Sequence, residues 1–169
     1  MGHNLATESE IKPHMRPGLS SGTTKTMTSF RPHAGEENVM TLEKKLHRSG
    51  PYADLFSQGV QVDNTLYLAG QVGMDDSGAT PEDLVSQMKL AYQNIQAVLA
   101  EFGADMDNIV DETWFVTDVN DCMAQVEALF TERHMIYGKA PEVSQTLVQV
   151  VALVDPALKI EIKCVAALG

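Results

Sequence analysis

The chain is poor in cysteine, in basic residues and in long apolar runs. Its 169 residues include two cysteines, Cys122 and Cys164, too few for the disulfide framework of a small secreted domain. No apolar run is long enough to predict a membrane-spanning helix. Lysine and arginine number 12 against 23 aspartates and glutamates, so the formal net charge is −11. Because this field repels nucleic acids and anionic membranes, we expect neither as a partner and predict a soluble, cytoplasmic protein.

Residues 1–39 differ in composition from the rest of the chain. They hold three of the five histidines and a run rich in Ser, Thr and Gly from Ser20 to Ser29. No hydrophobic periodicity is visible there, so the segment has little to bury. We expect a flexible N-terminal extension or leader over residues 1–39 and one folded domain over residues 40–169.

The domain begins with a hairpin pattern. Val60 and Val62 lead to Asp63-Asn64, a turn that tolerates positive φ, and an alternating strand resumes at Leu66. A third strand is expected over residues 109–117. Two more are expected over residues 145–153 and 158–166.

Two helices are expected between these strands. Thr80 is predicted to cap the first helix, whose apolar stripe runs from Leu84 to Phe102, and Gly103 to end it. Asn120 or Asp121 is predicted to cap the second. Its inward stripe comprises Met123, Val126, Leu129 and Phe130.

The element order β-β-α-β-α-β-β predicts an α/β (α+β) domain, with a mixed sheet carrying both helices on one face. The stretch from Leu147 to Leu153 is apolar on nearly both faces. Because two helices cover only one face of such a sheet, we expect a second copy of the chain to bury the other.

Six short segments occur in a recognisable order and spacing. They are Gly50-Pro51-Tyr52, Ser57-Gln58-Gly59-Val60, Asn64-Thr65-Leu66-Tyr67-Leu68-Ala69-Gly70-Gln71, Phe115-Val116-Thr117-Asp118, Val148-Gln149-Val150 and Lys159-Ile160-Glu161-Ile162. Over residues 46–168 the chain thereby resembles the Rid family (reactive intermediate deaminase, YjgF-like). The resemblance implies a chorismate-mutase-like fold and a homotrimeric barrel with small-molecule clefts at the subunit interfaces. It also implies hydrolysis of enamines and imines to a keto acid and ammonia, with no cofactor.

The resemblance places five ligand-binding positions in this sequence. Tyr52 keeps the family's tyrosine, whereas the other four positions differ: Ala69 replaces a serine, Val126 an asparagine, Gln145 an arginine and Lys163 a glutamate. No arginine lies between Lys139 and Gly169, so the arginine clamp for a substrate carboxylate is not restored nearby. Arg133 is interpreted as a solvated surface residue. An arginine-dependent deaminase is therefore not expected.

Several of these residues have alternative interpretations. Glu161 and Lys163 share one face of a strand, so Lys163 is either a replacement cation for an anionic ligand or part of an intersubunit salt-bridge network. Gln145 either binds ligand or satisfies buried backbone groups, and Tyr52 either contacts ligand or only packs.

Trp114 and Phe115 are expected to point to opposite faces of the third strand, with Trp114 in core or interface packing. Cys122, near a helix start, is interpreted as a structural thiol rather than a reactive one. Cys164 is expected to be inert. His47 and His134 have no ligand-like spacing, so no metal site is expected.

Two functions remain open at this point. The first is a Rid-like homotrimer that hydrolyses an imine, an enamine or a related carbonyl-derived metabolite without the arginine. The second is a non-catalytic ligand-binding or interaction trimer. The first predicts imine turnover and the second predicts binding alone.

Overall fold

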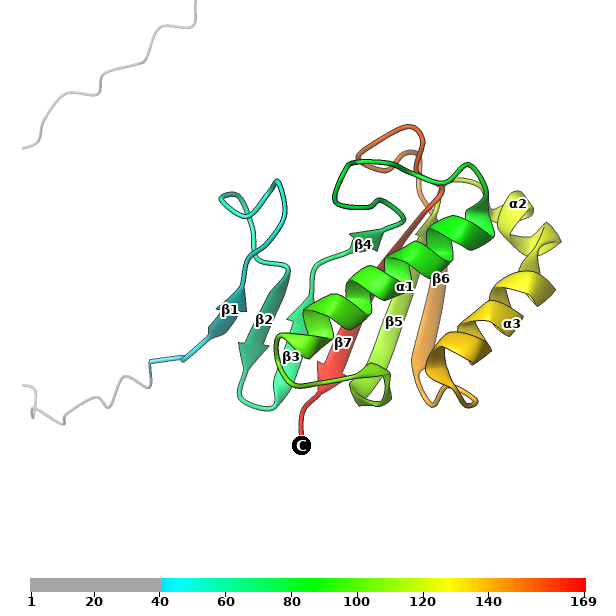
Figure 1. Ribbon diagram of the computed structural model, residues 1–169. Coiled ribbons are helices and arrows are strands. Elements are labelled where there is room, and N and C mark those ends of the chain that lie inside the picture. Colours follow the sequence, from blue (N-terminus) through cyan, green and yellow to red (C-terminus); the bar gives the residue numbers. More distant parts are fainter. Residues whose placement is uncertain (1–40) are drawn as a thin grey trace, which may run out of the picture. The chain divides into compact units, whose positions relative to one another are not determined.

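The computed structural model describes residues 41–169, which contain one mixed sheet covered by helices (Figure 1). The predicted extension over residues 1–39 lies outside the described residues. The strands are β1 (Lys45–His47), β2 (Gly59–Val62), β3 (Thr65–Leu68), β4 (Gln71–Val72), β5 (Ile109–Val116), β6 (Ser144–Gln149) and β7 (Ile160–Ala167). The helices are α1 (Leu84–Ala100), α2 (Val119–Ala124) and α3 (Val126–Tyr137), with a 3₁₀ turn at Met106–Asn108.

The sheet has the strand order β1-β2-β3-β7-β5-β6, and β4 pairs with β7 beyond the end of β3. Among the described strands, only β5 and β6 pair in parallel. The predicted hairpin is confirmed: β2 and β3 pair antiparallel, and Asp63 in their turn has φ 49°. The predicted mixed sheet with its helices on one face is likewise confirmed (Figure 1).

Helix α1 buries the predicted apolar stripe, but its expected cap was wrong. The helix begins at Leu84, where the Asp83 carboxylate accepts a hydrogen bond of 2.8 Å from the Ser86 backbone N–H. Thr80 lies outside the helix because the preceding segment is tied to a remote loop by Gln87. That buried amide donates to the carbonyls of Pro81 and Ala157 and accepts from the Lys159 N–H.

The predicted second helix is in fact two helices. Asp118, not Asn120 or Asp121, caps α2, and a break at Gln125 separates α2 from α3. The break changes the phase of the apolar stripe. Consequently Leu129 is fully buried, whereas Met123 and Phe130 are 55% and 42% exposed.

The predicted strand over residues 145–153 ends early, at Gln149. Its neighbour β5 ends at Val116, which pairs with Gln149. The residue after Val116, Thr117, donates its backbone N–H to the Lys159 carbonyl and not to the segment after β6. A strand without a partner strand cannot continue its ladder. The residues that follow therefore form a loop in which Val151 is fully exposed.

The two faces of the sheet differ sharply. Helices α1 and α3 cover one face (Figure 1), where Trp114 and Ile162 are fully buried. The alternate residues Phe115, Glu161 and Lys163 lie on the other face, so the predicted opposite orientations of Trp114 and Phe115 are confirmed. No described helix covers that second face, which is called the open face below.

Candidate functional site

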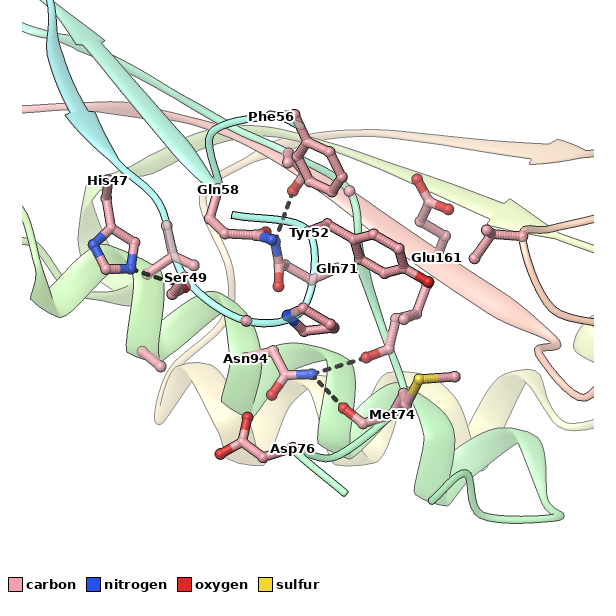
Figure 2. Close-up of a pocket in the computed structure, with 18 of the residues that line it drawn as sticks. His47, Ser49, Tyr52, Phe56, Gln58, Gln71, Met74, Asp76, Asn94 and Glu161 are labelled. Atoms are coloured by element: carbon pink, nitrogen blue, oxygen red, sulfur yellow. Dashed lines mark hydrogen bonds between the residues drawn. The ribbon is translucent and has the colours of Figure 1, made fainter. Parts of the chain in front are cut away.

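A cavity of about 890 Å³ lies beside the loop that joins β1 to β2. It is bounded by that loop, by β4 and the segment after it, by one flank of α1 and by Glu161 of β7 (Figure 2). A cavity of this size is within the range of small-molecule sites.

Aromatic side chains form one wall of this cavity. Gly50 turns the chain with φ 72°, and the following turn is closed by a bond of 2.9 Å from the Leu55 N–H to the Tyr52 carbonyl. This conformation stacks the ring of Tyr52 on that of Phe56, with 5.9 Å between the centroids. Tyr52 is 47% exposed, so its ring is available to a bound molecule.

Two amide groups hold the cavity's backbone in place. Gln71 donates to Gln58 Oε1 at 2.9 Å and to the Ala69 carbonyl at 3.2 Å. On the α1 side, the Asn94 Nδ2 donates to the carbonyls of Val72 and Met74, as Figure 2 shows. These bonds pin both ends of β4 and thereby set the shape of the cavity.

Glu161 supplies a half-buried carboxyl group to the cavity. Desolvation raises the pKa of Glu161 above its usual value, and the positive charge of Lys163 opposes this shift. Its side chain lies directly over Gly70, where a Cβ would overlap the carboxylate. The absence of a side chain at Gly70 therefore permits the observed position of Glu161.

We expect Gly70→Ala to displace Glu161 and to lower any activity that depends on this carboxylate by up to about 10²-fold. Substrate turnover and thermal unfolding of the same variant, measured together, check this expectation. Gly73→Ala is the matched comparison, because a Cβ there would meet the backbone of Gln87 and should lower stability instead. Unchanged turnover in Gly70→Ala would contradict a role for the Glu161 position.

The structure brings together two of the five predicted ligand-binding residues. Tyr52 and Ala69 line the cavity, whereas Val126, Gln145 and Lys163 lie outside its lining. Val126 begins α3, and Lys163 is exposed on the open face. Gln145 pairs with Glu112 in the parallel register, so it faces the helices rather than the open face.

Glu161 was not among the five predicted ligand-binding residues. It is two residues from Lys163 and shares its face, as predicted. The pairing of β4 with β7, which sets Val72 opposite Glu161, brings its carboxylate to the cavity. The sequence did contain an indication of this role, because Glu161 lies in the Lys159-Ile160-Glu161-Ile162 segment that resembles the Rid family.

The interpretation of Arg133 as a surface residue was wrong. Arg133 is 6% exposed, and its Nε donates to the fully buried Glu112 at 2.6 Å. Tyr92 and Tyr137 donate their hydroxyls to the other oxygen of Glu112, at 3.0 and 2.9 Å. Burial by itself lowers the pKa of Arg133, but the Glu112 carboxylate outweighs this effect and raises it. This buried cluster ties α1 and α3 to β5.

Both cysteines are free and buried. Desolvation raises the pKa of Cys122 and of Cys164, so neither thiol has an enhanced thiolate fraction. The structural interpretation of both residues agrees with this environment.

Within residues 41–169, no three His, Cys, Asp or Glu side chains gather to form a metal-binding group. No helix in that range is both long and apolar enough to cross a membrane.

Comparison with known proteins decides the family. The sequence profile of the family described as "Endoribonuclease L-PSP" matches residues 47–168. The chain belongs to this family, which is the Rid (YjgF-like) family. Its Rid domain is 34% identical over 133 residues to mouse "2-iminobutanoate/2-iminopropanoate deaminase", covering 78% of this chain and 91% of the mouse protein. It is 32% identical over 111 residues to the RutC family protein YjgH of Escherichia coli, covering 66% and 81% of the two chains.

Solved structures support the same assignment. The Rid-family protein YyfA of Yersinia pestis aligns with a TM-score of 0.65 at 27% identity, over 75% of this chain and all of that one. The YjgF gene product of E. coli aligns with a TM-score of 0.64 at 27% identity, covering 73% and 98%. The expected chorismate-mutase-like fold is thereby confirmed for this Rid domain.

Proposed function

We propose that this Rid-family chain hydrolyses an imine or enamine to a carbonyl compound and ammonia in the cavity bounded by Tyr52, Ala69 and Glu161. The observation that carries the proposal is the half-buried Glu161 carboxyl, whose pKa is raised, at an aromatic-walled cavity. A desolvated carboxyl group of this kind is suited to accept and return a proton during a reaction. The similarity to the mouse imine deaminase supports the same chemistry.

Imine hydrolysis consumes one water and moves both of its protons to nitrogen. The water oxygen bonds to the imine carbon while the C=N double bond opens, and the Glu161 carboxylate accepts one proton from that water and returns it to nitrogen, which gives a carbinolamine. The Glu161 carboxylate then takes the proton of the carbinolamine hydroxyl and delivers it to the amino nitrogen. As the carbonyl forms, the C–N bond breaks and nitrogen leaves as ammonia. The Tyr52 hydroxyl is suited to orient the substrate beside its own ring.

The proposed mechanism uses no arginine. None of the described residues that line the cavity is a lysine or an arginine. Gln145, at the position of the family arginine, faces the helices beside Glu112. In this mechanism, proton transfer through Glu161 is therefore the main contribution to catalysis, and no arginine binds a substrate carboxylate.

The decisive experiment follows the fate of freshly generated imines with semicarbazide as a trap. We expect the protein to compete with trapping by hydrolysing the imine, which lowers the rate of semicarbazone formation. The panel should include the imine derived from 2-aminoacrylate and uncharged imines. Ligand binding without acceleration of any imine would overturn the proposal in favour of a non-catalytic binding protein.

We also propose that the chain forms a homotrimer through the open face of its sheet. On this face Tyr67 and Val148 are 50% and 39% exposed, with Phe115 partly exposed between their strands. Apolar side chains on an uncovered sheet face favour burial by another copy. A trimer is also what the resemblance to the Rid family implies.

We expect the double variant Tyr67→Lys/Val148→Lys to dissociate, because each lysine would carry its charge into the buried interface. Size-exclusion chromatography with light scattering measures the mass of the wild type and of the variant. Met135→Lys is the control, since Met135 is 59% exposed on α3, away from the open face. A double variant with the mass of the wild-type trimer would contradict the proposed interface.

A further inference from the structure

The cavity's charged groups are almost all of one sign. Four carboxylates line it, from Asp75, Asp76, Glu101 and Glu161, and within the described chain its only basic lining residue is His47. His47 Nδ1 faces Glu101 at 3.7 Å, while its Nε2 shares a hydrogen bond with Ser49. A bound molecule therefore meets negative charge from three directions: from α1, from β7 and from the segment after β4.

Lys45, Arg48 and Lys163 do not line the cavity. Lys45 donates to the Glu101 carbonyl at 3.3 Å and lies over the Phe102 ring. Arg48 donates to the Ala53 carbonyl at 3.0 Å, which holds the loop rather than a ligand. Lys163 neighbours Glu161 along β7 but is exposed outside the cavity lining.

Asp75, in the segment after β4, is held in place by hydrogen bonds. The Asp75 carboxylate accepts hydrogen bonds from the Ser77 N–H and hydroxyl and from the Ala79 N–H. These bonds, led by that from the Ser77 side chain, lower the pKa of Asp75, so it remains ionised at neutral pH. Its charge is therefore a constant feature of the cavity mouth.

Beside the amides of Gln58, Gln71 and Asn94, the uncharged part of the lining is largely apolar. Tyr52, Phe56, Leu55, Met74 and Val98 provide aromatic and aliphatic surface. At about 890 Å³ the cavity can hold a substituent the size of an aromatic ring. An apolar group would be buried favourably here, whereas a carboxylate would be desolvated beside like charges with no lysine or arginine of the described lining to pair with it.

We infer that the cavity selects imines and enamines without a carboxylate, carrying an apolar or aromatic substituent. This inference rests on the proposed function and assigns its substrate class. Such a substrate is uncharged, and its protonated form is an iminium cation that the surrounding carboxylates stabilise. Its hydrolysis product is an aldehyde or ketone rather than a keto acid.

The inference is tested with two imines that differ only by the carboxylate. Phenylalanine oxidised by an amino-acid oxidase gives 2-imino-3-phenylpropanoate, and phenylethylamine oxidised by an amine oxidase gives the corresponding aldimine; catalase removes the peroxide in both. Semicarbazide trapping reports the acceleration of hydrolysis over the uncatalysed rate. We expect at least about tenfold greater acceleration for the aldimine, the size of a single unfavourable charge contact.

The outcomes separate the two proposals. Equal or greater acceleration of the carboxylate imine would overturn the charge selection and leave the imine hydrolase standing. No acceleration of either imine would overturn the proposed function itself. In that case calorimetric binding of phenylacetamide and phenylacetate still decides the inference, because tighter binding of phenylacetate would contradict it.

A charge-reversal pair sharpens the test. Asp76→Lys should shift the acceleration ratio toward the carboxylate imine, because it places a cation at the cavity mouth. Glu127→Lys changes the net charge equally but lies exposed at the start of α3, and it should leave the ratio unchanged. Equal ratios in both variants would overturn the inference.

Discussion

The Glu161→Gln variant is expected to lose about 10²–10⁴-fold in imine hydrolysis, the usual contribution of a general acid–base group. Glutamine keeps the shape of the side chain over Gly70 but does not take a proton from water. The measurement is the catalysed rate above the spontaneous rate in the trapping assay. Glu127→Gln makes the same chemical change at an exposed position of α3 and should retain wild-type activity.

The pH dependence of the wild type gives an independent check of this role. A carboxylate that acts as a base must be ionised, so the catalysed rate should fall as the pH drops through the pKa of Glu161. Desolvation raises that pKa above 4.5, so the midpoint of the acid limb should lie above 4.5. Lys163 lowers the same pKa, and Lys163→Gln should therefore move the midpoint upward. Full activity in Glu161→Gln, or an acid limb that persists in it, would contradict the assignment.

The Glu112→Ala variant is expected to lose about 3–5 kcal/mol of unfolding free energy, the usual cost of removing one partner of a buried ion pair. Arg133 would remain buried without a counter-charge. The hydroxyls of Tyr92 and Tyr137 would lose their acceptor, since both donate to Glu112. Urea unfolding measures the loss as a lower midpoint.

An exposed ion pair provides the control for this stability effect. Lys139 and Asp107 are 2.9 Å apart, with side chains 48% and 61% exposed. Because water screens such a pair, Asp107→Ala should change the midpoint far less than Glu112→Ala. Comparable losses in the two variants would show that the Glu112 cluster is not a principal support of the helix-covered face.

Features encoded by neighbouring residues were predictable. The β2–β3 hairpin follows from alternating apolar residues around Asp63-Asn64, and the stripe of α1 follows from its spacing. The expected end at Gly103 was close but wrong by a turn: α1 ends at Ala100 with Glu101 as its C-cap, and Gly103, with φ 70°, lies in the turn that follows. In each case the signal lies within a few residues of the feature.

Features set by distant partners were predicted incorrectly. The start of α1 depends on Gln87, which joins Pro81 to Ala157 across the fold. The end of β6 depends on where β5 ends, at Val116. The burial of Arg133 depends on Glu112 lying opposite it on β5. The pattern of apolar residues along one segment carries no information about these contacts with distant segments.

In the candidate site, too, some features follow from the local sequence and others from contacts between distant segments. Tyr52 and Glu161 belong to segments that the sequence already matched to the Rid family, yet 109 positions separate them along the chain. By itself the sequence determined the family, the mixed sheet and its helix-covered face. Only the tertiary structure decided that Glu161 rather than Lys163 or Gln145 meets Tyr52 at one cavity. The reason is physical: strand register determines which side chains share a face, and that register is set by pairing between distant segments.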